Sequence, residues 1–318
     1  MKALRNFLDR IEPHFEEGGK LSKLYFLYEA TDTILFTPGS VTAGAPHVRD
    51  ALNLKRMMTA VVVALTPTVV IALYNTGLQA NLAMQQLGVA AVEGWRGDVL
   101  EALAVGVSPG RILDNVIHGA LYFFPVYLIT VAAGGFWEVL FSSIRRHPIA
   151  EGFLVTSLLF PLILPPDIPW WQIVAGISFG VVFGKEVFGG VGMNVLNPAL
   201  TGRAFLYFAY PADISGDSAW VAVDGYSRAT PLAELTDPAL ELSAGLADTF
   251  WGFIPGSMGE TSVAACLIGA VILIGSKVGS WRIMSGCVLG MVAAAGMFNA
   301  IGSDTNAMFQ VTPLVHFL

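Results

Sequence analysis

Charged residues are scarce in this sequence, and their scarcity indicates the class of protein. Only 13% of the 318 residues are charged, against about 25% in soluble domains. Hydrophobic residues make up 54%, and the mean hydropathy is +0.64. The net charge of -7 argues against a nucleic-acid partner. Because the apolar residues gather into long runs, we expect one helical domain in a lipid bilayer rather than one or two soluble domains.

Cysteine is also rare, with two residues in the chain. Cys266 and Cys287 lie in apolar runs, far from any His or second Cys at ligand spacing. We therefore expect small buried hydrophobic residues rather than metal ligands. The first fifty residues are polar and mixed in charge, which predicts that no cleavable signal peptide is present.

The apolar runs predict an all-α integral membrane protein, a multi-helix bundle with short broken helices. Two runs fall short of the ~20 residues that cross a bilayer: residues 152–164, which contain Pro161, and residues 170–184. Interrupted segments of this kind line cavities in transporter-like folds, although a tight helical hairpin without a ligand explains them equally well. The runs lie near 57–75, 118–140, 152–164, 170–184, 195–210, 263–275 and 281–300, with an eighth from 307.

The distribution of charge predicts the orientation. Residues 1–56 contain eight Lys and Arg, so we expect a cytoplasmic N-terminal segment, followed by a transmembrane domain over 57–318. Later basic residues, including Arg145, Lys185 and Arg203, mark further cytoplasmic ends. The loop 211–262 has eight acidic residues against the single Arg228, which predicts that it lies on the periplasmic side.

The stretch 224–232 of this acidic loop has two compatible interpretations. Thr230 is a good helix N-cap, and Pro231 suits the first helical position. A helix N-terminus with free N–H groups also favours a phosphate. The residues alone therefore predict a capped helix that is suited to an anion.

Two glycine-containing runs precede predicted spans. In 189–199, the amides of Asn194 and Asn197 suit the edge of a flat polar ring, or they cap the next helix. In 256–262, Ser262 and Thr261 suit caps, and Glu260 complements the positive end of the helix.

The second span ends with a glycine pair and an acidic residue. Gly134 and Gly135 allow a ring or another helix to approach closely. Glu138 lies in an apolar run, where an ionisable side chain is a functional candidate. It equally snorkels to the interface or pairs with Arg145.

The motif 224–232, the two glycine-containing runs and the segment 45–58 together resemble the B subunit of sodium-translocating NADH:quinone reductases and its Rnf relatives, over nearly the whole chain. The segment 45–58 favours the B subunit over the Rnf D subunit. The resemblance implies ten helices in two inverted halves, as in urea transporters. Family members continue beyond residue 318, so we expect a C-terminally truncated sequence.

The resemblance also implies the cofactors and their sites. Flavin mononucleotide (FMN) would be attached to Thr230 through a phosphoester by a flavin transferase. Arg228 stands where the family usually has a small residue, so it would hinder the transferase or pair with the ester phosphate. No nucleophile or general acid is implied for turnover. The implied residues are Thr230, Ser227, Arg228, Glu260 and Thr261 for FMN; Asn194, Asn197 and Arg203 for riboflavin; Gly134 and Gly135 for ubiquinone; and Glu138 for Na⁺.

The implied function is electron transfer in a bacterial inner membrane, from a periplasmic-side FMN subunit through both flavins to ubiquinone, coupled to sodium export. Other membrane subunits and an NADH-oxidising flavin subunit would be partners. Two alternatives remain open: an Rnf D-like subunit of an ion-translocating ferredoxin:NAD oxidoreductase, and a cofactor-free channel or transporter on the same scaffold.

Overall fold

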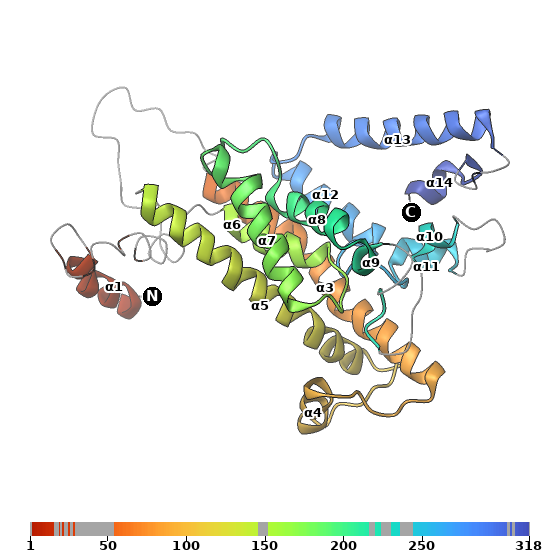
Figure 1. Ribbon diagram of the computed structural model, residues 1–318, viewed down its shortest axis with the longest axis horizontal. Coiled ribbons are helices and arrows are strands. Elements are labelled where there is room, and N and C mark those ends of the chain that lie inside the picture. The colour runs from red at the N-terminus through yellow and green to blue at the C-terminus, as the bar shows by residue number, and fades with distance from the viewer. Residues whose placement is uncertain are drawn as a thin grey trace.

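In the computed structural model, all the regular secondary structure of the described residues is helical (Figure 1). The described residues are 2–15, 19, 21, 25, 28, 54–145, 152–215, 220–223, 230–235, 244–303, 306 and 309–317, and they contain no β-strand. The helices are α1 (Lys2–Phe15), α3 (Leu54–Leu87), α4 (Trp95–Ala102), α5 (Ile112–Arg145), α6 (Gly152–Leu162), α7 (Trp170–Gly184), η2 (Glu186–Phe188), α8 (Pro198–Ala209), α9 (Pro211–Ile214), α10 (Pro231–Glu234), α11 (Leu246–Trp251), α12 (Val263–Gly275), α13 (Trp281–Ile301) and α14 (Pro313–Phe317).

Four helical stretches are long and apolar enough to cross a membrane, namely Arg56–Leu87, Ile112–Arg145, Trp170–Phe188 and Trp281–Ile301. The chain is therefore a multi-pass membrane protein, as predicted. The predicted short segments are short helices, because α6 has 11 residues and α7 has 15. With η2, however, the α7 stretch reaches 19 residues and qualifies as a span.

The two longest helices extend beyond their predicted spans. We predicted apolar runs near 57–75 and 118–140, whereas α3 and α5 have 34 residues each. At ~1.5 Å per residue each is about 51 Å long, which exceeds the ~30 Å hydrocarbon core. The extension of α3 was missed because its second half contains Asn75, Gln79 and Asn81, which lower the hydropathy. All three side chains are buried in the protein.

Glycines allow two helix pairs to approach until their backbones touch. A Cβ atom at Gly77 of α3 would meet the carbonyl oxygen of Asn115 in α5, and one at Gly119 of α5 would meet that of Leu73 in α3. Gly176, Gly180 and Gly184 lie one turn apart on α7 and face α8. Such small residues at four-residue spacing are typical of close packing between membrane helices.

The apolar core lies between these pairs. It includes Phe123 of α5, Phe160 of α6, Ile177 of α7 and Leu206 of α8, each at most 1% exposed. Figure 1 shows α13 extending away from this bundle, beside α14.

The two cysteines correct one expectation. We predicted that Cys266 and Cys287 are buried, but both are exposed. They lie on α12 and α13, whose surfaces carry many exposed apolar side chains. Burial was the wrong inference because an apolar run in a membrane protein faces lipid as readily as protein.

Two non-helical segments meet beside the core. At the end of α6, the carbonyl oxygen of Leu162 accepts a hydrogen bond from Gly259 N–H (2.7 Å), and just beyond it that of Leu164 accepts one from Met258 N–H (3.1 Å). A Cβ atom at Gly259 would meet the side chain of Leu162. The segment 254–262 is therefore held directly against the end of α6.

We expect the substitution Gly180→Val to destabilise the protein by about 1–3 kcal/mol, because the added side chain would meet the backbone of Pro198. Gly286→Val on α13 is the matched control, since no atom lies within 4 Å of a Cβ atom there. Thermal unfolding in detergent measures both. Equal losses in the two variants would contradict the packing account.

Candidate functional site

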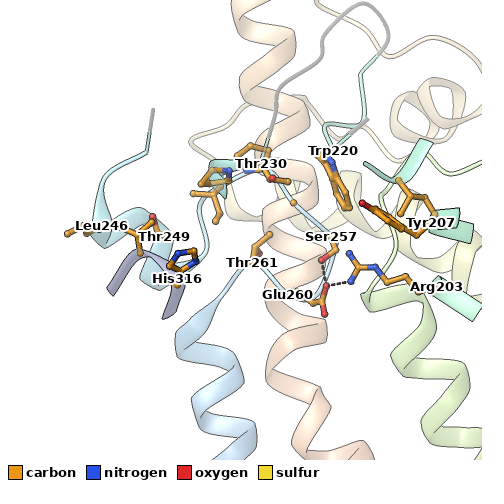
Figure 2. Close-up of a pocket in the computed structure, with 16 residues that line it drawn as sticks. Arg203, Tyr207, Trp220, Thr230, Leu246, Thr249, Ser257, Glu260, Thr261 and His316 are labelled. Carbon is orange, nitrogen blue, oxygen red and sulfur yellow. Dashed lines mark hydrogen bonds and ion pairs between the residues drawn. The ribbon is translucent and has the colours of Figure 1, made fainter. Parts of the chain in front are cut away.

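A cavity of about 450 Å³ gathers residues that are far apart in the sequence (Figure 2). Its walls come from α8, from Trp220, from Thr230 at the start of α10, from α11, from the segment 254–261 and from α14. We call it the Thr230 cavity. Four predicted site residues line it together: Thr230, Arg203, Glu260 and Thr261. A cavity of this size falls in the usual range for small-molecule sites.

Thr230 is the N-cap of α10, as predicted. Its hydroxyl oxygen accepts a hydrogen bond from the backbone N–H of Ala233 at 3.3 Å, and Pro231 occupies the first helical position. The side chain is partly buried at the wall of the cavity. Ser227 and Arg228, the other predicted residues of this motif, lie outside the described residues.

Arg203 and Glu260 form an ion pair on the cavity wall, with 2.8 Å between Nη1 and Oε2. The hydroxyl group of Ser257 donates to the same carboxylate oxygen at 2.7 Å, and Figure 2 shows the three side chains converging. Glu260, which we predicted to complement the end of the following helix, has Arg203 and Ser257 as its side-chain partners. The cap of α12 is Ser262, whose hydroxyl oxygen accepts from Ala265 N–H at 3.2 Å.

The position of Arg203 corrects the interpretation of charge. We grouped Arg203 with Lys185 as a marker of the cytoplasmic side, yet it lines the same cavity as Thr230 in the acidic loop. The reason is that α8 packs along α7 from Gly184 back towards Gly176, so α8 leads away from Lys185. Arg203 is therefore a cavity residue and does not indicate orientation.

A side chain of α3 holds Thr261 in position. Asn75 donates through Nδ2 to the carbonyl oxygen of Ile254 (2.9 Å) and to the hydroxyl oxygen of Thr261 (3.3 Å). Gln79, one turn further along α3, donates to Asn75 Oδ1 at 3.2 Å. A buried polar chain thus connects α3 to the cavity wall. The sequence signal was a set of amides at helical spacing beyond an apolar run.

Asn194 and Asn197 do not line the Thr230 cavity. Asn197 is the N-cap of α8 and accepts from Ala199 N–H (2.9 Å) and Leu200 N–H (3.2 Å), so the capping interpretation is confirmed. Asn194 donates to the carbonyl oxygen of Leu196 at 2.8 Å. The preceding Gly189, Gly190 and Gly192 all have positive φ, which explains why this turn uses glycine.

Gly134 and Gly135 lie at a helix contact. A Cβ atom at Gly134 would be 2.6 Å from the Phe153 ring of α6 and 3.0 Å from Ile177 of α7. The Phe153 ring is also the nearest neighbour of Gly135, at 3.7 Å. The space that this glycine pair leaves is therefore taken by a ring of the protein itself.

Glu138 belongs to a network of four charges, three of them buried, that links α5 to the end of α7. Its carboxylate forms an ion pair with Lys185, and Lys185 also lies 3.3 Å from Glu186. Arg145 completes the network with an ion pair to Glu186 at 3.1 Å and a hydrogen bond to the carbonyl oxygen of that residue at 2.6 Å. The side chains of Glu138, Lys185 and Glu186 are at most 4% exposed.

This network corrects one prediction and adds two residues. Of the alternatives for Glu138, snorkelling to the interface is wrong because the carboxylate is buried, where it pairs with Lys185. Sequence reasoning used Lys185 only as a marker of orientation and overlooked Glu186. The signal was present: adjacent opposite charges directly follow an apolar run that ends in glycine.

Tyr207, Trp220 and Ser257 are further cavity residues that the sequence did not indicate. Trp220 is buried and donates through its ring nitrogen to Ser215 O at 2.9 Å. Tyr207 is half exposed on α8. Tyr207 and Trp220 lie in positions without a motif, so only the fold brings them to Thr230, whereas Ser257 belongs to the glycine-containing run 256–262.

The fold defines a multi-pass membrane protein, and its described residues enclose a cavity of small-molecule size. A sequence profile described as the NQR2, RnfD, RnfE family matches residues 41–318, and the chain belongs to this family. The B subunit of the Na(+)-translocating NADH-quinone reductase from Stutzerimonas stutzeri is 56% identical over 96% of this chain and 77% of its own length. The B subunits from Chromohalobacter salexigens (55%; 96% and 75%) and Pseudomonas aeruginosa (54%; 97% and 78%) are also similar. The predicted resemblance to the B subunit is confirmed.

We expect Glu138→Gln to destabilise the protein by about 3 kcal/mol, because it leaves the buried Lys185 ammonium group with less compensating charge. The double variant Glu138→Gln/Lys185→Met should recover most of the loss. Thermal unfolding in detergent measures both, and Asp9→Asn, which removes the exposed Arg5–Asp9 pair, is the control with little expected effect. A double variant less stable than Glu138→Gln would contradict the pairing.

Proposed function

We propose that this chain is the flavin-carrying membrane subunit of a Na⁺-translocating NADH:quinone reductase and that FMN is attached to Thr230 in the Thr230 cavity. One observation supports this most directly. The hydroxyl group that the family motif assigns to the phosphoester shares a cavity with Arg203, Glu260 and Thr261, which come from other parts of the chain. A cofactor-free channel gives no reason for this convergence.

The residues of the cavity fit the chemistry of FMN. Arg203 lies on the wall, and guanidinium groups bind phosphate oxygens well. Tyr207 and Trp220 offer aromatic surfaces for a flat ring, and Ser257, Thr249 and Thr261 are hydroxyl-bearing wall residues. When bound, the flavin supplies the redox chemistry.

The protein itself would attach the flavin, orient it and shield it from solvent. Thr230 provides the ester oxygen, and its capping position at α10 holds that oxygen at the cavity wall. Glu260 holds Arg203 in place and balances its charge until a phosphate competes for the guanidinium group. The hydrogen bonds from Gly259 and Met258 to the end of α6 keep the opposite wall in position.

The remaining sites are proposed from the family resemblance. Riboflavin would lie near Asn194 and Asn197, ubiquinone near Gly134 and Gly135, and Na⁺ would enter near Glu138. A quinone ring at the glycine pair requires the Phe153 ring to move away from Gly134. The charge network around Glu138 balances two acidic against two basic groups, so a cation there would have to displace Lys185 from a carboxylate.

We further propose the setting in which the chain works. It would lie in a bacterial inner membrane with residues 1–56 in the cytoplasm and the loop 211–262 on the periplasmic side. An FMN-carrying subunit on that side would deliver electrons to Thr230-linked FMN. Other membrane subunits and an NADH-oxidising flavin subunit would complete the complex. The inverted-repeat arrangement of urea transporters is proposed for the helices.

We expect the intact mass of the chain, co-expressed with its flavin transferase, to exceed the sequence mass by one FMN less one water. Thr230→Ala should abolish this increase, because the ester oxygen is gone. Thr249→Ala is the matched control: it removes another threonine hydroxyl of the same cavity, one that donates within its own helix region, to Gly245 O at 3.0 Å.

An unmodified wild-type mass, with the transferase active on a known substrate, would sink the proposal and favour a cofactor-free channel or transporter. A flavin that persists in Thr230→Ala would place the attachment at another residue.

A further inference from the structure

We propose that Asn75 makes the hydroxyl group of Thr261 a hydrogen-bond donor to the flavin ring in the Thr230 cavity. This inference rests on the function proposed above and adds a positioning residue to that site. Asn75 is on α3, 3% exposed, and does not line the cavity. It would therefore act on the flavin only through Thr261.

The carbonyl oxygen of Ile254 determines the orientation of the Asn75 amide. The carbonyl oxygen of Ile254 can only accept, so the nitrogen of Asn75 must face it, at 2.9 Å. The amide oxygen then faces Gln79, whose nitrogen lies 3.2 Å away and donates to it. With the amide fixed in this way, its second hydrogen is directed to Thr261 Oγ1 at 3.3 Å.

The hydrogen bond from Asn75 determines which further hydrogen bonds the hydroxyl group of Thr261 can make. A hydroxyl group has one hydrogen to donate and two lone pairs that accept. Asn75 uses one of the lone pairs, so the hydrogen of Thr261 must find an acceptor elsewhere. Among the residues that the structure describes, none accepts it, although Thr261 is only 5% exposed. A buried hydroxyl group without an acceptor is costly.

The cavity is where this acceptor would be supplied. Thr261 lines it beside Ser257 and Glu260, and Figure 2 shows Thr261 between Thr230 and Glu260. The carbonyl oxygens and bare ring nitrogens of a flavin are acceptors of the kind that a threonine hydroxyl binds. Since reduction of the ring adds negative charge, a donor at this place favours the reduced flavin.

The decisive measurement is the midpoint potential of the covalent flavin in the purified complex, by spectroelectrochemical titration. Thr261→Val removes the donor and keeps the shape, so we expect about a tenfold shift towards the oxidised form, which is about 59 mV for one electron. Thr261→Ser keeps the hydroxyl group and should stay near the wild type. Asn75→Asp should lower the potential in the same direction, because the new carboxylate accepts the Thr261 hydrogen.

Thr68→Val is the matched control, because Thr68 lies on α3 outside the cavity, is buried, and its hydroxyl group already donates to Leu65 O at 2.7 Å. It should leave the potential unchanged. The intact mass of each variant shows whether the flavin is attached, so failure of the proposed function is seen separately as a missing FMN. Flavin present on Thr230, with equal potentials in Thr261→Val and Thr261→Ser, would overturn the inference. The comparison of Thr261→Val with Thr261→Ser tests the inference even if Asn75→Asp does not fold.

Discussion

Backbone that leaves the helical path and is buried has to find its hydrogen-bond partners within the protein. The end of α6 and the segment 254–262 form backbone hydrogen bonds with each other. The segment 254–262 also accepts hydrogen bonds from Asn75 of α3. The Thr230 cavity depends on this pairing, because one of its walls is the segment 254–261. Had residues 254–261 continued as helix, most of their backbone groups would be bonded within that helix, and Ser257, Glu260 and Thr261 would not converge on Thr230.

The described residues form two polar clusters, one neutral and one charged. On one side, amides and hydroxyl groups from α3 support the cavity with neutral hydrogen bonds. On the other, Glu138, Lys185, Glu186 and Arg145 form a charged network that balances to zero. The neutral set supports the flavin site proposed above, and the charged set surrounds the Na⁺ position proposed there. Helix α5 packs against α3 and α7, and α7 packs against α8. Both sites are therefore built on the same set of packed helices.

Much of this could be predicted from the sequence, and the failures share a cause. The membrane class, the short helices, the cap at Thr230 and the family followed from composition and motifs. The second half of α3 was missed and the burial of Cys266 was wrong, because hydropathy reports what a residue is and not what it faces. For the same reason charge assigned Arg203 and Thr230 to opposite sides, although they line one cavity. Asn75 lowers the hydropathy of α3 but points into the protein. The pairing of Glu138 with Lys185 depends on packing between α5 and α7 that no local pattern encodes.

The glycines of α7 have a consequence for permeation. Gly176, Gly180 and Gly184 bring α7 so close to α8 that even a single added carbon would collide with backbone or side-chain atoms. No hydrated ion, nor a file of water molecules, fits along an interface of that kind. Any route for sodium within this chain must therefore avoid the α7–α8 contact. Ile177 of α7 meets Gly134 of α5, and Glu138 lies one turn further along α5.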